Sequence, residues 1–402
     1  MLSFEFCRPT NYIFGRYTEN QVARLIANLG YKKVLLVYGC GSCVKTGLLD
    51  KVINLLEQAD IDVVTLGGVE ANPKADFVYR GISLSREHQL EFILAVGGGS
   101  VIDTAKAIAL GVPDEGDFFD FFLGKRVPVQ ALKIGVILTI AAAGSEGSIN
   151  TLIEKEIEGR VVKKSCITKL NLPEFAILNP ELTFSVSQYQ TACGVCEMIC
   201  HILEYYFTNT QDVSVSDRLC EGLLLSIIDN ALIVKDDPEN YEVRANLMWA
   251  CTLAHCDLCG AGRENDCASH NLGHQLSALY NIPYGAGLAV IFPAWMEFTY
   301  KHDVMRFVQF ANRIFGCAVN FDDPESTARA GIESFREFLF DLGLPLSFED
   351  LGAKVSDIPL LLNMLGVDDV NRTEGNFMIL HRRECEQIYR NAASYNSKTL
   401  RY

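Results

Sequence analysis

Short apolar runs, most of which end in glycine or proline, recur through the first 180 residues, and amphipathic stretches separate them. Strands that are buried on both faces of a parallel sheet read as continuous apolar runs, whereas the stretches between them have the apolar spacing of helices. Their alternation predicts βα units and a doubly wound parallel sheet. The apolar runs lie at residues 32–39, 62–68, 91–99, 133–140 and 174–180, and the helical patterns between them include 20–29, 48–58 and 101–110.

The pattern changes after Pro180, where strand signals nearly vanish and long segments keep helical periodicity. We therefore predict an α/β domain over residues 1–180 and an all-helical domain over residues 181–402. The predicted helices of the second domain cover residues 187–208, 214–234, 240–258, 267–280, 289–315, 324–342, 350–364 and 385–393.

The composition narrows the choice of partners. The chain has 402 residues, of which 49% are apolar and 21% are charged, as in ordinary globular proteins. Its net charge of −15 argues against nucleic-acid binding, which depends on a positive field. The N-terminus lacks the plan of a signal peptide, and no apolar run reaches the roughly 18 residues of a membrane span. We therefore expect a cytoplasmic protein with neither nucleic acid nor membrane as a partner.

Fourteen cysteines are scattered through the chain. In a long chain without a signal peptide they favour reduced thiols over disulfides. Three C-x-x-C pairs are too far apart in sequence for the paired spacing of a zinc site, so packing is the preferred interpretation and metal or redox chemistry is the alternative. The pairs are Cys40 with Cys43, Cys193 with Cys196, and Cys256 with Cys259.

The sharpest local signal of the first domain is the stretch AVGGGSVIDTAKAIA, in which an apolar run leads through three glycines and a serine into a helical pattern. Glycines allow the backbone to approach a ligand closely, and a helix N-terminus attracts phosphate. The spacing is not the usual dinucleotide fingerprint, so a purely structural turn is the alternative. The residues concerned are Gly97, Gly98, Gly99 and Ser100.

Further glycine turns follow other predicted strands, in YGCGSCVKTG (38–47), GGVEANP (67–73) and LTIAAAGSEGS (138–148). Ligands of doubly wound sheets bind outside the carboxyl ends of the strands, so several such turns favour an extended ligand such as a dinucleotide. Thr139 and Ser145 in the last turn supply hydroxyls for a phosphate or a carboxamide. Ordinary turn chemistry explains these two residues equally well.

Two polar pairs interrupt apolar helices of the second domain, Glu197 with His201 and His270 with His274. Residues four apart share one face of a helix. The pairs fit core packing, an acid/base pair, or a divalent metal held by a carboxylate and two imidazoles with a position open for substrate. Such a metal polarises an alcohol or carbonyl oxygen. A metal of this kind together with a nucleotide-binding first domain favours hydride transfer.

The chain resembles the iron-containing (group III) alcohol dehydrogenases, in particular their butanol-dehydrogenase-like branch. The similarity runs over nearly the whole length. It implies a Rossmann-like N-terminal domain and an all-helical C-terminal domain, the dehydroquinate synthase-like fold, assembled as a homodimer. The motifs that carry it are PTNYIFG, GGVEANP, VGGGSVIDTAKAIA, AAGSE, FAILNPELT, YQTACGV, HILEYYFT, SALYNIP and GAGLAVIFPAWM.

The resemblance also implies a nicotinamide cofactor on the first domain. The glycine turn at residues 97–100 would hold the pyrophosphate. Gly39 stands where NAD-preferring relatives often carry an aspartate that binds the ribose 2′-hydroxyl, and with Gly41 and Ser42 beside it the sequence favours NADP over NAD. The other residues that the resemblance places along the cofactor are Asn72, Thr139, Ser145 and Lys163.

By the same resemblance, one aspartate and three histidines would hold a divalent metal, iron or zinc. This chain has Glu197 at the aspartate position, His201 and His270 at two of the histidine positions, and Tyr284 at the third. A phenol has an ordinary pKa of about 10 and must lose its proton to bind a metal well. His274 matches a histidine that the family keeps near the substrate, outside the metal's ligands.

Three functions are open at this point. The first is a metal-assisted oxidoreductase that transfers a hydride between NAD(P)H and a small aldehyde or primary alcohol, with His274 or Tyr284 relaying the proton. The second is a metal-independent reductase of the same fold, in which one of these two residues donates the proton. The third is a catalytically lapsed protein that binds nucleotide or serves a structural role, because drift would produce an altered ligand set.

Overall fold

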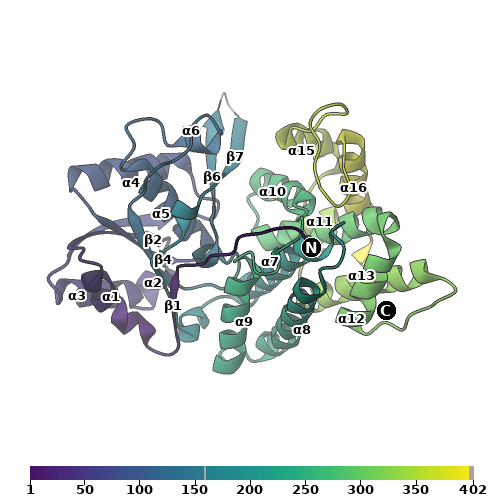
Figure 1. Cartoon of the computed structure of the whole chain (residues 1–402), viewed down its shortest axis with the longest axis horizontal. Helices are drawn as coiled ribbons and strands as arrows, with labels where there is room; N and C mark the ends of the chain where they lie inside the picture. The colour runs from purple at the N-terminus through teal and green to yellow at the C-terminus, as the bar shows by residue number, and fades with distance from the viewer. Residues whose placement is uncertain (158–159, 398–402) are drawn as a thin grey trace. The chain divides into compact units, whose positions relative to one another are not determined.

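The computed structural model describes residues 1–157 and 160–397. They form two compact units, neither of which is continuous in sequence (Figure 1). The sheet unit comprises Cys7–Val186 and Asp237–Cys256. The helical unit comprises Met1–Phe6, Ser187–Asp236 and the described residues from Asp257 onward.

The sheet unit is built on a six-stranded parallel sheet in the order β1-β8-β5-β4-β2-β3. The strand order reverses between β2 and β4, because the chain passes from β2 outward to β3 and then returns to the other side of β2. Ligands of open α/β sheets bind at such a switch point, outside the carboxyl ends of the strands. The strands are β1 (Asn11–Phe14), β2 (Lys33–Gly39), β3 (Asp62–Val69), β4 (Phe92–Gly97), β5 (Lys133–Leu138) and β8 (Phe175–Leu178).

Helices cover both faces of this sheet (Figure 1). Successive residues of a strand point to opposite faces, so Leu35 and Val37 of β2 pack with α4 and α5, whereas Val34 and Leu36 pack with α1 and α3. Each face therefore buries its own apolar layer, as predicted for a doubly wound sheet. The helices are α1 (Val22–Asn28), α2 (Ser42–Lys45), α3 (Leu48–Glu57), α4 (Ala75–Glu87), α5 (Gly99–Gly111) and α6 (Phe119–Phe122), with 3₁₀ turns η1 (Thr18–Gln21), η2 (Ser145–Gly147), η3 (Lys169–Asn171) and η4 (Pro180–Thr183).

The apolar runs did not predict β1 or the antiparallel hairpin of β6 (Asn150–Ile157) and β7 (Arg160–Ile167). β1 is four residues long and pairs only with β8 among the described strands, at one edge of the sheet. The hairpin strands mix charged with apolar residues. This mixture is typical of strands with one exposed face, and it lacks the continuous apolar run of a buried parallel strand.

Helix α9 (Tyr241–Ala254) packs within the sheet unit, although the chain reaches it from the helical unit. Trp249 makes an edge-to-face contact with Tyr12, with ring centroids 5.7 Å apart, and Thr252 donates a hydrogen bond to Oε1 of Glu146 at 2.6 Å. The sequence-based division assigned this segment to the helical domain. Periodicity identifies a helix, but it does not say which apolar surface the helix covers.

The helical unit follows the predicted periodicity, with two divisions. The helix expected over residues 289–315 is two helices, because the chain turns at η5 (Tyr300–His302) and Asp303 then caps the next helix by accepting a hydrogen bond from the backbone N–H of Arg306. The helix expected over residues 350–364 is likewise divided. The helices are α7 (Gln188–Tyr206), α8 (Ser214–Asp236), α10 (Ala268–Tyr280), α11 (Tyr284–Thr299), α12 (Val304–Phe315), α13 (Pro324–Asp341), α14 (Phe348–Leu351), α15 (Ile358–Leu365) and α16 (Arg382–Ser394), with η6 (Val355–Asp357) before α15.

All fourteen cysteines lie among the described residues, and none of them forms a disulfide. Most are buried, which agrees with the interpretation that they pack as small apolar side chains. In the part of the chain that the structure describes, no helix combines the length and the apolar character that crossing a bilayer requires.

Candidate functional site

The central glycine turn lies between β4 and α5, beside the switch point of the sheet. β4 ends at Gly97, Gly98 is the N-cap of α5, and the helix begins at Gly99. A Cβ atom on Gly97 would lie 2.5 Å from Cγ2 of Val101, and one on Gly98 would lie 2.1 Å from Cγ2 of Ile140. Only glycine fits at either position without movement, so the backbone there stays bare at the N-terminus of a 13-residue helix, where an anion binds favourably.

Two other predicted cofactor positions lie next to this turn. The backbone N–H of Thr139 donates a hydrogen bond to the carbonyl oxygen of Gly97 at 3.1 Å. Gly39, at the end of β2, faces Val101 across the turn, because a Cβ atom there would lie 3.6 Å from Cγ2 of Val101. Gly41 has a φ of 148°, which favours glycine, and Ser42 begins α2. The sheet therefore gathers the predicted turns after β2, β4 and β5.

Ser145 lies in a buried network beneath α5. Its hydroxyl donates to Oδ1 of Asp103 at 2.6 Å and accepts from Nζ of Lys106 at 3.0 Å. Burial lowers the pKa of Lys106 to about 8. The negative charges of Asp103 and Glu146 oppose this shift but do not cancel it. The same ammonium donates to backbone carbonyl oxygens of Ser145, Ser148 and Asn150. The hydroxyl of Ser145 is thus engaged inside the protein, and the network holds the loop after β5 against the helix.

Lys163 and Asn72 lie together although 91 positions separate them. Nζ of Lys163, on β7, donates a hydrogen bond to Oδ1 of Asn72 at 2.9 Å and lies 3.7 Å from Oε1 of Glu154. Asn72 has a φ of 61°, a left-handed conformation that asparagine tolerates better than most residues. The hairpin therefore brings two of the predicted cofactor residues into contact.

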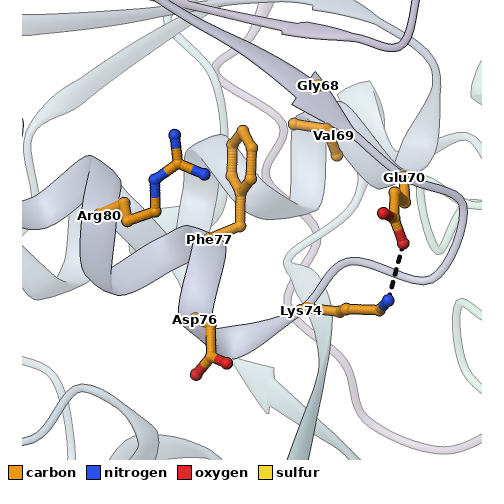
Figure 2. Close-up of a pocket in the computed structure, with 7 residues that line it drawn as sticks. All are labelled: Gly68, Val69, Glu70, Lys74, Asp76, Phe77 and Arg80. Carbon is orange, nitrogen blue, oxygen red and sulfur yellow. Dashed lines mark hydrogen bonds and ion pairs between the residues drawn. The ribbon is translucent and has the colours of Figure 1, made fainter.

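A separate hollow of about 180 Å³ lies at the edge of the sheet, between β3 and α4 (Figure 2). An ion pair of 2.7 Å between Lys74 and Glu70 crosses one side of it. None of the predicted site residues lines the hollow. Its volume is also smaller than the roughly 300–1,000 Å³ of most ligand pockets. The hollow is therefore not the candidate site. Its lining residues are Gly68, Val69, Glu70, Lys74, Asp76, Phe77 and Arg80.

The helical unit assembles the predicted metal residues on α7, α10 and α11. The rings of His201 and His270 stack with centroids 4.3 Å apart and planes inclined by 20°. The rings of His274 and Tyr284 also stack, with centroids 4.3 Å apart. The ring centroids of Tyr284 and His270 are 5.5 Å apart. Glu197 is buried on α7, and its charge contributes to the raised pKa of Tyr284.

A second carboxylate, Glu204, lies beside two of the histidines. Ligand atoms of His201, Glu204 and His270 all lie within 4.8 Å of one another. Glu204 was not among the predicted site residues, although it follows His201 by three positions and therefore shares its helix face. Burial raises the pKa of Glu204, and contact with His270 opposes that shift. The spacing H-x-x-E of His201 and Glu204 is the sequence signal that could have identified this carboxylate.

Tyr284 holds its proton. The ring is partly exposed, but burial around the hydroxyl raises its pKa well above the ordinary value, and the charges of Glu204 and Glu197 raise it further. The hydroxyl donates a hydrogen bond to the backbone carbonyl oxygen of His270 at 3.2 Å. Tyr284 is one of the predicted metal residues, and a phenol binds a metal well only after it has lost its proton.

The remaining donors fit a divalent metal. His270 is buried, and neither ring nitrogen makes a hydrogen bond of normal geometry with a described residue. Its Nδ1 lies 2.5 Å from Oε1 of Glu204, an ion-pair contact, and its Nε2 has no such contact. A buried imidazole nitrogen of this kind, next to a second imidazole and a carboxylate, is a donor set for iron or zinc.

Comparisons with known proteins agree with both units. The family described as "Iron-containing alcohol dehydrogenase" matches residues 9–180, and "Fe-containing alcohol dehydrogenase family, C-terminal" matches residues 191–393. The chain is 37% identical to a probable NADH-dependent butanol dehydrogenase 2 of Bacillus subtilis, covering 97% of this chain and 99% of the relative. It is 36% identical to the NADPH-dependent aldehyde reductase YqhD of Escherichia coli, covering 91% and 93%.

A solved structure of similar fold is that of NADH-dependent butanol dehydrogenase A from Thermotoga maritima. It has a TM-score of 0.93 and 36% identity, and the match covers 98% of this chain and 99% of that one. The predicted combination of a doubly wound α/β domain with a mostly helical domain is thereby confirmed. By sequence and by fold, the chain belongs to the iron-containing alcohol dehydrogenase family.

Proposed function

We propose that this protein transfers a hydride between NAD(P)H and a small aldehyde or the corresponding primary alcohol, assisted by a divalent metal, iron or zinc. The observation that carries the proposal is the stack of the partly buried His201 on the buried His270, with ring centroids 4.3 Å apart and the buried carboxylate of Glu204 beside them, so that side-chain atoms of all three residues lie within 4.8 Å of one another. The relatives' names, butanol dehydrogenase and aldehyde reductase, support the substrate class.

The sheet unit supplies the residues for the nicotinamide cofactor, which provides or accepts the hydride when bound. Gly97, Gly98, Gly99 and Ser100 would bind its pyrophosphate through the bare backbone at the start of α5. Thr139, Asn72 and Lys163 would lie along it, and Ser145 would keep its loop in place through Asp103. Gly39, Gly41 and Ser42 leave no carboxylate to repel a 2′-phosphate, which favours NADP over NAD.

The helical unit supplies the residues for the metal, which acts when bound as a Lewis acid toward the alcohol or carbonyl oxygen. His201 and His270 would bind it through ring nitrogens, and Glu197 would add a carboxylate. Tyr284 keeps its proton, and His274 stacks on its ring at 4.3 Å. These two side chains are therefore the candidates to hold and pass the proton that the reaction takes up or releases.

A metal-independent reductase of the same fold is the second candidate. The raised pKa of Tyr284 favours it, because a phenol that stays neutral can donate its proton to a developing alkoxide without a metal. The two candidates differ in what a chelator does to the reaction.

The test is oxidation of NADPH and of NADH by the purified protein over a panel of short aldehydes, together with metal analysis. One metal per chain and turnover that a chelator abolishes would support the metal-assisted reaction. Turnover that survives complete metal removal would refute it in favour of the second candidate. Cofactor binding without turnover on any aldehyde would refute both and indicate a catalytically lapsed member.

We further propose that the protein is a cytoplasmic homodimer. β1 pairs on one side only among the described strands, so it leaves an edge at which a second copy can add. Light scattering on the purified protein would give twice the chain mass of 44.6 kDa for a dimer. A mass of one chain at micromolar concentration would refute the dimer.

A further inference from the structure

Glu204 has a set of contacts that the proposed function does not yet use. Its side chain is buried, and it projects from α7 toward the first turn of α10. Oε1 accepts hydrogen bonds from the hydroxyl of Ser269 at 2.8 Å and from the backbone N–H of His270 at 3.2 Å. The same oxygen lies 2.5 Å from Nδ1 of His270. One carboxylate oxygen is therefore shared by three donor positions at the start of α10.

These contacts fix α10 relative to α7. A carboxylate at a helix N-terminus satisfies backbone N–H groups that have no partner within the helix, and it interacts favourably with the helix dipole. The backbone carbonyl oxygen of Glu204 also accepts from the N–H of Asp266 at 3.0 Å, just before α10 begins. The place of the His270 ring next to His201 therefore depends on Glu204.

The position of the carboxylate also selects the protonation of the ring. A neutral imidazole carries its single proton on one of its two nitrogens. The group that faces one ring nitrogen determines whether that nitrogen or the other carries the proton. The contact of 2.5 Å between Nδ1 and the carboxylate oxygen lies outside normal hydrogen-bond geometry, but an ionised carboxylate oxygen repels a lone pair at that distance, so the proton belongs on Nδ1. Nε2 then presents its lone pair.

We infer that Glu204 is a positioning residue, which holds His270 with its proton on Nδ1 and with Nε2 bare and ready to bind the metal. The inference rests on the proposed metal-assisted function. It assigns Glu204 a role outside the metal's own ligands, because Oε1 is occupied by three contacts from α10. A carboxylate that orients a histidine in this way commonly changes metal affinity by about 10- to 100-fold.

The first test uses the metal-free protein. Two-dimensional ¹H–¹⁵N spectra of protein labelled with [¹⁵N]histidine report which ring nitrogen carries the proton in each of the seven histidines, and loss of a signal in His270→Ala assigns His270. We expect His270 to carry its proton on Nδ1 in the unaltered protein. A proton on Nε2 would overturn the inference without recourse to any further variant, so the test survives if a Glu204 variant fails to fold.

The second test compares two carboxylates of the same helix. Glu204→Gln is expected to shift His270 toward a mixture of the two protonated forms and to weaken binding of Zn(II) alone by about 10- to 100-fold. Glu197→Gln, at the predicted ligand position, is expected to weaken Zn(II) binding while His270 keeps its proton on Nδ1. Glu204→Asp, which retains the charge, should recover part of the affinity. Loss of zinc in Glu204→Gln with the His270 spectrum unchanged would show that Glu204 is itself a ligand and would overturn the inference.

These readouts separate the inference from the proposed function. If the protein reduces no aldehyde, the proposed function fails, whereas the spectrum of His270 still decides the role of Glu204. If turnover is normal and His270 carries its proton on Nε2, the inference fails and the proposed function stands.

Discussion

The hydroxyl of Tyr284 donates a hydrogen bond to the backbone carbonyl oxygen of His270, 3.2 Å away. A hydrogen bond therefore joins two of the predicted metal residues, through the side chain of one and the backbone of the other. The bond also uses the phenolic proton, which a metal would have to displace. Tyr284 thus keeps a proton close to the predicted metal residues.

Restoring an imidazole at this position should strengthen metal binding. We expect Tyr284→His to raise the affinity for Zn(II) by about tenfold or more, since changes to outer partners alone move metal affinity by such factors. Tyr284→Phe removes the hydroxyl without adding a ligand and should leave the affinity unchanged. Competition titration with a chromogenic chelator measures both variants. Equal affinities in the two variants would mean that residue 284 does not face the metal.

Cofactor choice should respond to a single carboxylate at the end of β2. Gly39 has room for a side chain, because its Cβ atom would make only ordinary contacts of 3.6 Å with Val101 and with the carbonyl oxygen of Val69. Gly39→Asp should lower the ratio of kcat/KM for NADPH to that for NADH by at least about tenfold, through repulsion of the 2′-phosphate. Gly39→Ala adds bulk without charge and should leave the ratio close to its original value. An aspartate that leaves the ratio unchanged would place the ribose elsewhere.

The glycine turn should tolerate no added carbon at Gly97. The Cβ atom of Gly97→Ala would lie 2.5 Å from Cγ2 and 2.8 Å from Cβ of Val101, so the start of α5 has to move. We expect a loss of about 1–3 kcal/mol in unfolding free energy and weaker NADPH binding by titration calorimetry. Gly222→Ala, on the exposed face of α8 with open space around it, should gain up to about 1 kcal/mol and bind NADPH as before. Unimpaired NADPH binding in Gly97→Ala would contradict the assignment of this turn.

An ion pair in the helical unit should give a pH-dependent stability. The guanidinium of Arg306 donates to both carboxylate oxygens of Asp217, at 2.7 and 2.6 Å. A guanidinium nitrogen of Arg263 lies 2.9 Å from Oδ1 of the same carboxylate. Burial alone would raise the pKa of Asp217, but these hydrogen bonds and charges lower it below the ordinary 3.8. The folded chain therefore binds the proton less readily than the unfolded chain does.

This difference in proton binding determines the direction in which stability changes with pH. The stabilisation is fully present above about pH 4 and is lost as the pH falls through the folded pKa. Asp217→Asn should lower Tm at pH 7, at a cost of about 3 kcal/mol for leaving the arginines unpaired, and the gap to the original protein should narrow below pH 4. Asp229→Asn, at an exposed position of the same helix, is the control in calorimetry from pH 7 to pH 3. A gap that stays constant over this range would contradict the argument.

Local patterns predicted most of the fold. The apolar run before Gly97 and the periodic stretch after it correspond to β4 and α5 within two residues at each end, because a buried strand and its following helix are specified by consecutive residues. α9 lay beyond this reasoning, since its periodicity is that of any helix, and contacts distant in sequence, such as those with Tyr12 and Glu146 more than 100 positions away, place it on the sheet unit.

The site was predicted less completely than the fold. His201 and His270 could be named from spacing and resemblance, and the structure brings their rings together. Glu204 could not be recognised without the packing of α7 against α10, because its partners Ser269 and His270 are 65 and 66 positions away. Ser145 shows the converse, since a hydroxyl that looks available in a glycine turn is bound to Asp103 in the fold.

The position of α9 limits how the protein can be divided. The chain passes from one unit to the other four times, after residues 6, 186, 236 and 256. A fragment that stops at residue 180 or 186 lacks α9, so it would uncover Tyr12 and leave the buried carboxylate of Glu146 without the hydroxyl of Thr252. No single cleavage releases an intact half. In evolution and in chimaeras made with a relative, residues 237–256 therefore have to be exchanged together with the rest of the sheet unit. Each unit is compact in the folded chain, but neither corresponds to one continuous segment of the sequence.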